Sequence, residues 1–152
     1  MKTRIATILG AVAILATALF TGAAIYISLV EHSVRFSVDP IDALRQWRLS
    51  YQAAAPIQAS LATIGCLAAI LTALINRQFV WALAGVLIGS VIPLTLLIIM
   101  PVNQALFAFP LNAQSNEIQN MLLAWGQWHA VRSLLSLAAL VLLIWLYRSQ
   151  RQ

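Results

Sequence analysis

Four uninterrupted apolar runs set the strongest limit on what this chain can fold into. They extend over residues 5–30, 53–75, 79–100 and 122–146. A helix needs about 20 apolar residues to cross the hydrocarbon core of a bilayer, and each run reaches that length. Only 9% of the residues are charged, against about 25% in soluble domains. The sequence therefore predicts an all-α integral membrane protein, a single domain over residues 1–152 with four transmembrane helices in an antiparallel bundle.

The first run shares features with a secretory signal peptide. Lys2 and Arg4 precede it, and it contains the small-residue segment Ala16-Thr17-Ala18. Its apolar stretch continues to Val30, about twice the length of a signal-peptide core. We therefore expect it to be retained as a membrane anchor.

Basic residues collect at the ends of the runs and give the chain a net charge of +5. They form no patch, so nucleic acid is not an expected partner. Five lie on one side of the predicted membrane: Lys2, Arg4, Arg77, Arg148 and Arg151. Three lie on the other side, together with all four carboxylates: Arg35, Arg45 and Arg48. Because basic residues favour the inner side, we expect both termini to be cytoplasmic, in a bacterial inner (plasma) membrane. The lipid bilayer is the expected partner, and the sequence leaves open whether the chain forms homo-oligomers.

The connections between the runs differ in length. Residues 76–78 alone join the second and third runs, which requires a tight antiparallel hairpin. In the first outer loop, Asp39 and Pro40 have the chemistry of a helix start, and apolar residues recur at helical spacing after them. The sequence predicts a short amphipathic helix over about residues 40–51, lying on the outer interface. Pro56 and Pro93 lie inside the second and third runs, and either could kink its helix and splay the outer half of the bundle or be locally accommodated.

Polar residues from all four runs fall at one depth near the outer face. Trp145, Tyr147 and Arg148 anchor the inner end of the fourth run, and counting about 20 residues back puts Arg132 just below the outer interface. The same count brings eight side chains to one level: Glu31, His32, Tyr51, Asn103, Trp125, Trp128, His129 and Arg132. On the fourth run, Trp125, Trp128 or His129, and Arg132 follow helical spacing and therefore share one face of the helix. An arginine at that depth facing lipid costs about 2.5 kcal/mol or more, so we expect that face of the fourth helix to point into the bundle.

Simpler explanations exist for several of these residues. Trp47, Trp81 and Trp145 are expected to be interfacial anchors. Arg132 and Glu31 could form a purely structural ion pair, and the histidines could be ordinary interfacial side chains. Two histidines with Glu31 could also bind a metal, but their spacing gives no support, so no metal site is predicted.

Four sequence segments resemble one family of small four-helix membrane proteins. They are Tyr26-Ile-Ser-Leu-Val-Glu31-His32, Trp47-x-x-Ser50-Tyr51 with Gln58, Pro93-x-Thr95 with Met100-Pro101-Val102-Asn103, and Trp125-x-x-Trp128-His129-x-x-Arg132. Together they resemble the anthrone oxygenases over essentially the whole chain. Ser33 departs from the pattern, because a proline is expected after Glu-His.

The resemblance implies a cofactor-independent oxygenase that uses O₂ to convert an anthrone- or quinol-like aromatic compound to a quinone. It implies His129 as the general base, with an ordinary pKa of about 6.5, and Arg132 as the stabiliser of the enolate oxygen. Trp125 or Trp128 would stack on the substrate, and Tyr51 and Asn103 would orient it. Glu31 and His32 complete the predicted substrate-binding set.

Two other classes of function stay open at this point. The polar residues could hold together a non-catalytic membrane scaffold or dock a partner subunit. Alternatively, His32 and His129 could bind a metal or haem. An enclosed cavity beside His129 and Trp128 with room for two or three fused rings favours the oxygenase, whereas a filled interior with Arg132 fully paired favours the scaffold.

Overall fold

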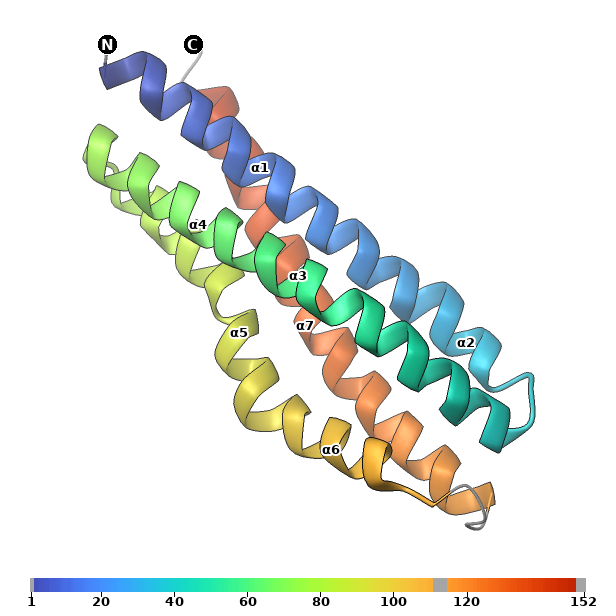
Figure 1. The fold of residues 1–152 in the computed structure, drawn as a ribbon. Coiled ribbons are helices and arrows are strands. Elements are labelled where there is room, and N and C mark those ends of the chain that lie inside the picture. Colours follow the sequence, from blue (N-terminus) through green and yellow to red (C-terminus); the bar gives the residue numbers. More distant parts are fainter. Residues whose placement is uncertain (1, 111–114, 150–152) are drawn as a thin grey trace.

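The computed structural model describes residues 2–110 and 115–149, which contain helices and no β-strand. Four long helical rods lie side by side (Figure 1). The first joins α1 (Lys2–Tyr26), the π-helical turn η1 (Ile27–Glu31) and α2 (His32–Arg35). The second rod is α3 (Pro40–Asn76). The third joins α4 (Phe79–Gly89), α5 (Val91–Leu94), the π-helical turn η2 (Thr95–Ile99) and α6 (Met100–Ala108). The fourth is α7 (Ser115–Ser149).

All four rods are long and apolar enough to span a membrane, which confirms the prediction of a four-helix membrane bundle. The outer surface of the bundle is apolar: Leu29, Phe79 and Leu97 are 71%, 80% and 75% exposed. Such an exposed apolar surface suits contact with lipid. The protein is therefore an integral membrane protein.

The separate interfacial helix expected over residues 40–51 is wrong, because those residues are the first three turns of α3. Asp39 caps this helix by accepting a hydrogen bond from the backbone N–H of Ile41 at 2.9 Å, with Pro40 at the first helical position. Leu44 and Trp47 are fully buried inside the bundle instead of lying on the membrane surface. Burial of this stripe against the other rods holds the segment in line with the rest of α3.

The third rod bends where Pro93 interrupts it. Proline cannot donate to the carbonyl four residues earlier, here that of Gly89, and α4 ends at that residue. A short α5 and the π-helical turn η2 follow, and the rod bows away from α3 around α5 (Figure 1). Pro56, in contrast, lies within an uninterrupted α3. The splaying predicted from the prolines therefore arises from Pro93.

The two halves of the bundle pack differently. In the inner half, small residues let helices approach closely: a Cβ added at Gly65 would lie 2.8 Å from the hydroxyl of Thr17. The core there is mostly alanine: Ala13, Ala68, Ala69, Ala73 and Ala84 with Trp81, Leu143 and Leu146. In the outer half, large side chains separate the rods: Ile27, Ala43, Leu44, Trp47, Ile99, Leu106, Ile118, Leu122 and Trp125.

Two of the three tryptophans expected at the interfaces are part of these cores. Trp47 and Trp81 have no exposed surface, so their assignment as interfacial anchors is wrong. Trp145 is 60% exposed on the outside of α7, consistent with an anchor. Hydropathy alone cannot tell a buried indole from one at the interface, because both follow apolar residues.

Candidate active site

Two neighbouring cavities lie in the outer half of the bundle. The first has a volume of about 20 Å³ and a wall with several polar side chains, made by Ile27, Arg35, Trp47, Ser50, Tyr51, Ala54, Ala55, Gln58, Trp125, His129 and Arg132. The second has a volume of about 160 Å³ and a mostly apolar wall, made by Phe20, Tyr51, Ala55, Gln58, Ala59, Ala62, Val91, Ile92, Thr95, Leu96, Met100 and Arg132. We call them the polar cavity and the apolar cavity. They share Tyr51, Ala55, Gln58 and Arg132, so these four residues form the boundary between them.

Both π-helical turns contribute to this region. Ile27 of η1 lines the polar cavity, and Thr95 and Leu96 of η2 line the apolar cavity. A π turn shifts the register of a helix by one residue and often lies at a functional site. Here the two turns alter the inward-facing residues of the first and third rods next to the cavities.

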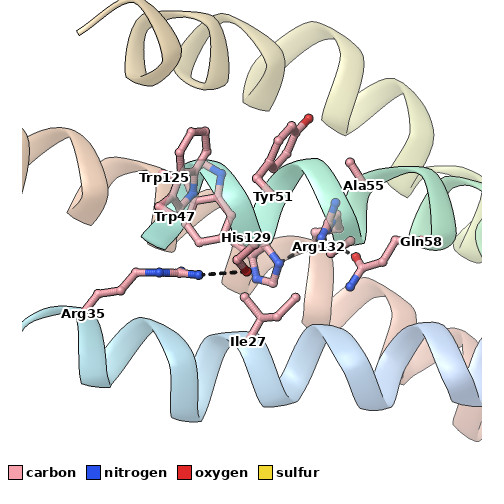
Figure 2. A pocket seen from close by; sticks show the side chains of 11 residues that line it. Ile27, Arg35, Trp47, Tyr51, Ala55, Gln58, Trp125, His129 and Arg132 are labelled. Carbon is pink, nitrogen blue, oxygen red and sulfur yellow. Dashed lines mark hydrogen bonds between the residues drawn. The ribbon is translucent and has the colours of Figure 1, made fainter. Parts of the chain in front are cut away.

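His129 is buried and its hydrogen bonds fix its tautomer. Its Nε2 lies 2.9 Å from Nη2 of Arg132, and its Nδ1 lies 3.0 Å from Oγ of Ser28. A guanidinium can only donate, so Nε2 must accept and the proton of the neutral ring must be on Nδ1. Ser28 Oγ is also 3.2 Å from Oγ of Ser133, which donates to the His129 carbonyl. The imidazole is therefore held with its Nε2 lone pair toward Arg132 at the cavities (Figure 2).

A second chain of hydrogen bonds joins three rods. Nε1 of Trp125 donates to Oδ1 of Asn103 at 2.9 Å, and Nδ2 of Asn103 donates to the hydroxyl oxygen of Tyr51 at 2.8 Å. Because an indole N–H only donates, this chain fixes the orientation of the Asn103 amide. The Tyr51 oxygen is thus an acceptor in this chain, and its own O–H is left to donate at the boundary of the cavities.

Two further groups at the boundary carry donors that lack acceptors. Arg132 donates through Nη2 to Oε1 of Gln58 at 2.6 Å, while its buried Nε has no partner. Since Oε1 of Gln58 accepts that bond, its amide nitrogen faces elsewhere, and this buried Nε2 also has no partner. Buried donors without acceptors are rare in proteins and cost about 1–3 kcal/mol each. The boundary therefore has the hydrogen-bonding capacity to bind an oxygen atom of a ligand.

Arg35 approaches the polar cavity from the side opposite Arg132 (Figure 2). Its Nη2 donates to Oε2 of Glu31 at 2.7 Å and to Oγ of Ser50 at 3.3 Å, and its Nε donates to Oε1 of Gln46. The guanidinium lies 5.5 Å from the centre of the Trp125 ring, within cation–π range. Although it is only 3% exposed, its Nη1 has no partner.

The structure brings together five of the eight site residues predicted from the sequence. Tyr51, Trp125, His129 and Arg132 line a cavity, and Asn103 joins two of them. Trp128 does not: it is 39% exposed and lines neither cavity.

Glu31 and His32 lie beside the site rather than in it. His32 packs against Trp125, with ring centres 5.7 Å apart, and lines neither cavity. Glu31 pairs with Arg35, so the suggested Glu31–Arg132 ion pair is wrong. Arg132 is bonded to Gln58 and His129 instead.

The contributors missed as site residues include Arg35, Ser28, Ser50 and Gln58. Arg35 was counted as a topology charge, although its spacing of four residues from Glu31 is that of a helical ion pair. Ser28 and Ser50 lie inside the family-like segments, which was the available signal. Over the described ranges, no group of three or more histidine, cysteine, aspartate or glutamate residues could hold a metal ion.

Fold and site together define a four-helix membrane protein with a donor-rich polar cavity joined to an apolar cavity. The sequence matches the model of the anthrone oxygenase family over residues 47–142. This is more than half of the chain, which therefore belongs to the anthrone oxygenase family. The matched range includes Tyr51, Gln58, His129 and Arg132, but not Arg35.

One curated relative is the anthrone oxygenase tpcL of Aspergillus fumigatus, which is 43% identical over 63 residues. The match covers 40% of this chain and 39% of that protein, so it spans less than half of either. No solved structure matches this chain.

Proposed function

We propose that this protein is a cofactor-independent oxygenase that oxidises anthrone- or quinol-like aromatic compounds to quinones with O₂. Membership of the family supports an oxygenase acting on anthrone-type substrates. The observation that carries the proposal is the boundary between the cavities. There, Gln58 and Arg132 have buried nitrogens without acceptors, and the Tyr51 hydroxyl accepts from Asn103 without using its own proton. All three residues line an apolar space suited to aromatic rings.

The reaction needs a base and a group that stabilises an oxyanion. An anthrone loses a proton from its methylene carbon to give an enolate, whose negative charge lies largely on oxygen. The cation of Arg132 and the Tyr51 hydroxyl supply charge and a hydrogen bond for that oxygen, in a site with little water. In the overall reaction the methylene carbon loses two hydrogens and gains one oxygen atom of O₂. The second oxygen atom leaves as water with those two hydrogens.

His129 is the proposed base, acting through Nε2. In the structure that lone pair accepts a hydrogen bond from Arg132. A substrate oxygen that takes over this Arg132 donor would release Nε2 to accept the methylene proton. The Ser28 and Ser133 hydroxyls keep the opposite nitrogen protonated, so the ring stays in the tautomer that a base requires.

The size and position of the apolar cavity support lateral entry from the bilayer. Its 160 Å³ is close to the roughly 150 Å³ of an engineered cavity that holds one benzene ring. A three-ring substrate must therefore extend beyond it. Ala59 of α3 and Leu96 of η2 line the cavity and are exposed on the outside of the bundle, so the remaining rings can lie between these helices toward lipid.

The scaffold alternative fits the site less well. It requires a filled interior and a fully paired Arg132, but the described residues enclose two cavities and leave Arg132 Nε unpaired. A binding function is therefore favoured over a purely structural one.

The test is O₂ consumption by the protein in liposomes, given a panel of anthrones and quinols. Because anthrones also oxidise spontaneously, protein-free liposomes give the background rate. We expect the native chain to exceed this background and His129→Ala to return to it, with quinone formed in a 1:1 ratio to O₂ for the anthrones. Unchanged turnover in the variant would remove His129 from the mechanism, and a native chain at background would reject the oxygenase.

We also propose that both termini are cytoplasmic, in the inner (plasma) membrane of a bacterium. The start of α1 and the end of α7 lie at the same end of the bundle as the α3–α4 turn (Figure 1). The basic residues without carboxylates belong to these segments. A reporter that is active only in the cytoplasm should then work when fused to the C-terminus. A reporter that is active only outside the cytoplasm should work when inserted in the α2–α3 loop. The reverse pattern would contradict the proposal.

A further inference from the structure

The polar cavity lies in a locally positive environment. Two guanidinium groups, those of Arg35 and Arg132, line it. Arg35 is balanced by Glu31, but Arg132 is held by the neutral side chains of Gln58 and His129. Within the described ranges, Arg132 therefore contributes a positive charge without a carboxylate partner. A buried charge of this kind favours a negatively charged ligand.

Unpaired nitrogen atoms also indicate a ligand in the polar cavity, independently of charge. Arg35 Nη1 and Arg132 Nε are both buried and have no acceptor. Arg35 is more than nine-tenths buried and is otherwise fixed by Glu31, Gln46 and Ser50, so its guanidinium is held in place. A ligand with lone pairs in the cavity would supply the missing acceptors.

Size limits what that ligand can be. The cavity volume of about 20 Å³ is a little above the roughly 10–15 Å³ that one water requires. It therefore admits a ligand of one or two non-hydrogen atoms and excludes an aromatic ring. The apolar parts of its wall, Ile27, Ala54 and Ala55, also suit a small neutral molecule before it gains charge.

We propose that the polar cavity is the dioxygen site, and that Arg35 stabilises superoxide as it forms there. This inference rests on the proposed function, which supplies the electron donor. The substrate enolate transfers one electron to O₂ across the boundary at Tyr51 and Ala55, which gives a substrate radical and superoxide. One superoxide oxygen then bonds to the radical carbon, forming a peroxide anion, with no further oxidant or reductant. Arg35 acts electrostatically on the reduced oxygen, since charge develops there only after the electron arrives.

The first test is the O₂ dependence of the rate. Arg35→Met should lower kcat/KM for O₂ by about 10- to 100-fold. This loss is equal to or somewhat smaller than the loss caused by removing one oxyanion-hole donor in other enzymes. KM for the anthrone should change less than about twofold, because Arg35 does not line the apolar cavity. Arg35→Lys should recover part of the loss by restoring the charge.

The matched control is Arg48→Met. Arg48 is a partly buried arginine in the first turns of α3. Unlike Arg35, it donates to the carbonyls of Leu106 and Phe109 and lines neither cavity. We expect this variant to keep its kcat/KM for O₂. An equal loss in both arginine variants would overturn the specific role of Arg35.

A second test uses the native chain, so it does not depend on the folding of a variant. Chloride fits the cavity by size and charge, and gluconate at equal ionic strength does not fit. Chloride should therefore raise the apparent KM for O₂ and leave KM for the anthrone unchanged. If chloride changes the apparent KM for O₂ no more than gluconate does, the cavity holds only water and the dioxygen site is overturned. An active native chain would in that case still support the oxygenase. A native chain that oxidises no substrate in the panel would instead reject the proposed function itself.

Discussion

Tyr51→Phe is the variant that best separates the chemistry of the site from its architecture. It removes a single oxygen atom and leaves the ring that stacks on Trp47, with ring centres 5.2 Å apart. That oxygen accepts a hydrogen bond from Nδ2 of Asn103 at 2.8 Å and has a free O–H at the boundary of the two cavities. The substitution therefore removes one structural bond and one proposed substrate bond at the same time.

The two losses have different sizes and different readouts. A hydrogen bond to a charged group is worth about 1.5–3 kcal/mol, so the loss of the Tyr51 donor to the enolate oxygen should lower kcat by roughly 10- to 100-fold. The Asn103 amide left without its acceptor should lower the free energy of unfolding by about 1–2 kcal/mol. The first is measured by quinone formation at saturating O₂ and anthrone, and the second by thermal unfolding in detergent.

Asn103→Ala and Tyr26→Phe provide the comparisons. Asn103→Ala should destabilise the bundle at least as much as Tyr51→Phe, since it also leaves the buried Trp125 indole unpaired. It should nevertheless lower kcat less, because the Tyr51 hydroxyl is retained. Tyr26 is 54% exposed and lines neither cavity, so its variant should behave like the native chain. If Tyr51→Phe folds normally and turns over at the native rate, Tyr51 does not donate to the reacting oxygen.

Two further predictions concern packing and access. A Cβ at Gly126 would overlap Nε2 of His32, whereas one at Gly22 meets nothing within 4 Å. Gly126→Ala should therefore be about 1–3 kcal/mol less stable than Gly22→Ala in thermal unfolding, since overpacking costs that much and the gain in helix propensity is common to both. Equal stability would mean that His32 moves aside freely. Ala59→Leu narrows the exposed opening of the apolar cavity and should raise KM for the anthrone about 10-fold, whereas Ala53→Leu, exposed on α3 outside the cavity wall, should leave it unchanged. An unchanged KM in both would show that the substrate enters elsewhere.

The site shows where sequence reasoning succeeds. Depth in the membrane follows from counting residues along a helix, because each residue adds a fixed rise and the spans have a common length. This placed Tyr51, Asn103, His129 and Arg132 at one level without any structure. The inward direction of the helix face that carries Arg132 followed from the cost of exposing an arginine to lipid.

The contacts between side chains within that level could not be predicted from the sequence. A Glu31–Arg132 ion pair was one alternative because both residues lie near the outer face, but Glu31 bonds Arg35 on the next turn of its own rod. Trp128 was grouped with His129, yet it faces outward while Trp125, three residues earlier, faces the cavity. Neighbouring residues on a helix point in directions about 100° apart, so the face that points inward depends on how the helix is rotated against its neighbours.

The sequence by itself determined the class of protein, the number of spans and the depth of the polar residues, because hydropathy and chain length act locally. Which of the two prolines breaks its helix was left to the structure. Only the tertiary structure decided that residues 40–51 continue α3, that Trp47 and Trp81 are buried, and that Arg35 and Arg132 lie on opposite sides of His129. These features depend on the rotation of each rod and on the spacing between rods. Both are set by side-chain packing between segments far apart in the chain, which no local pattern encodes.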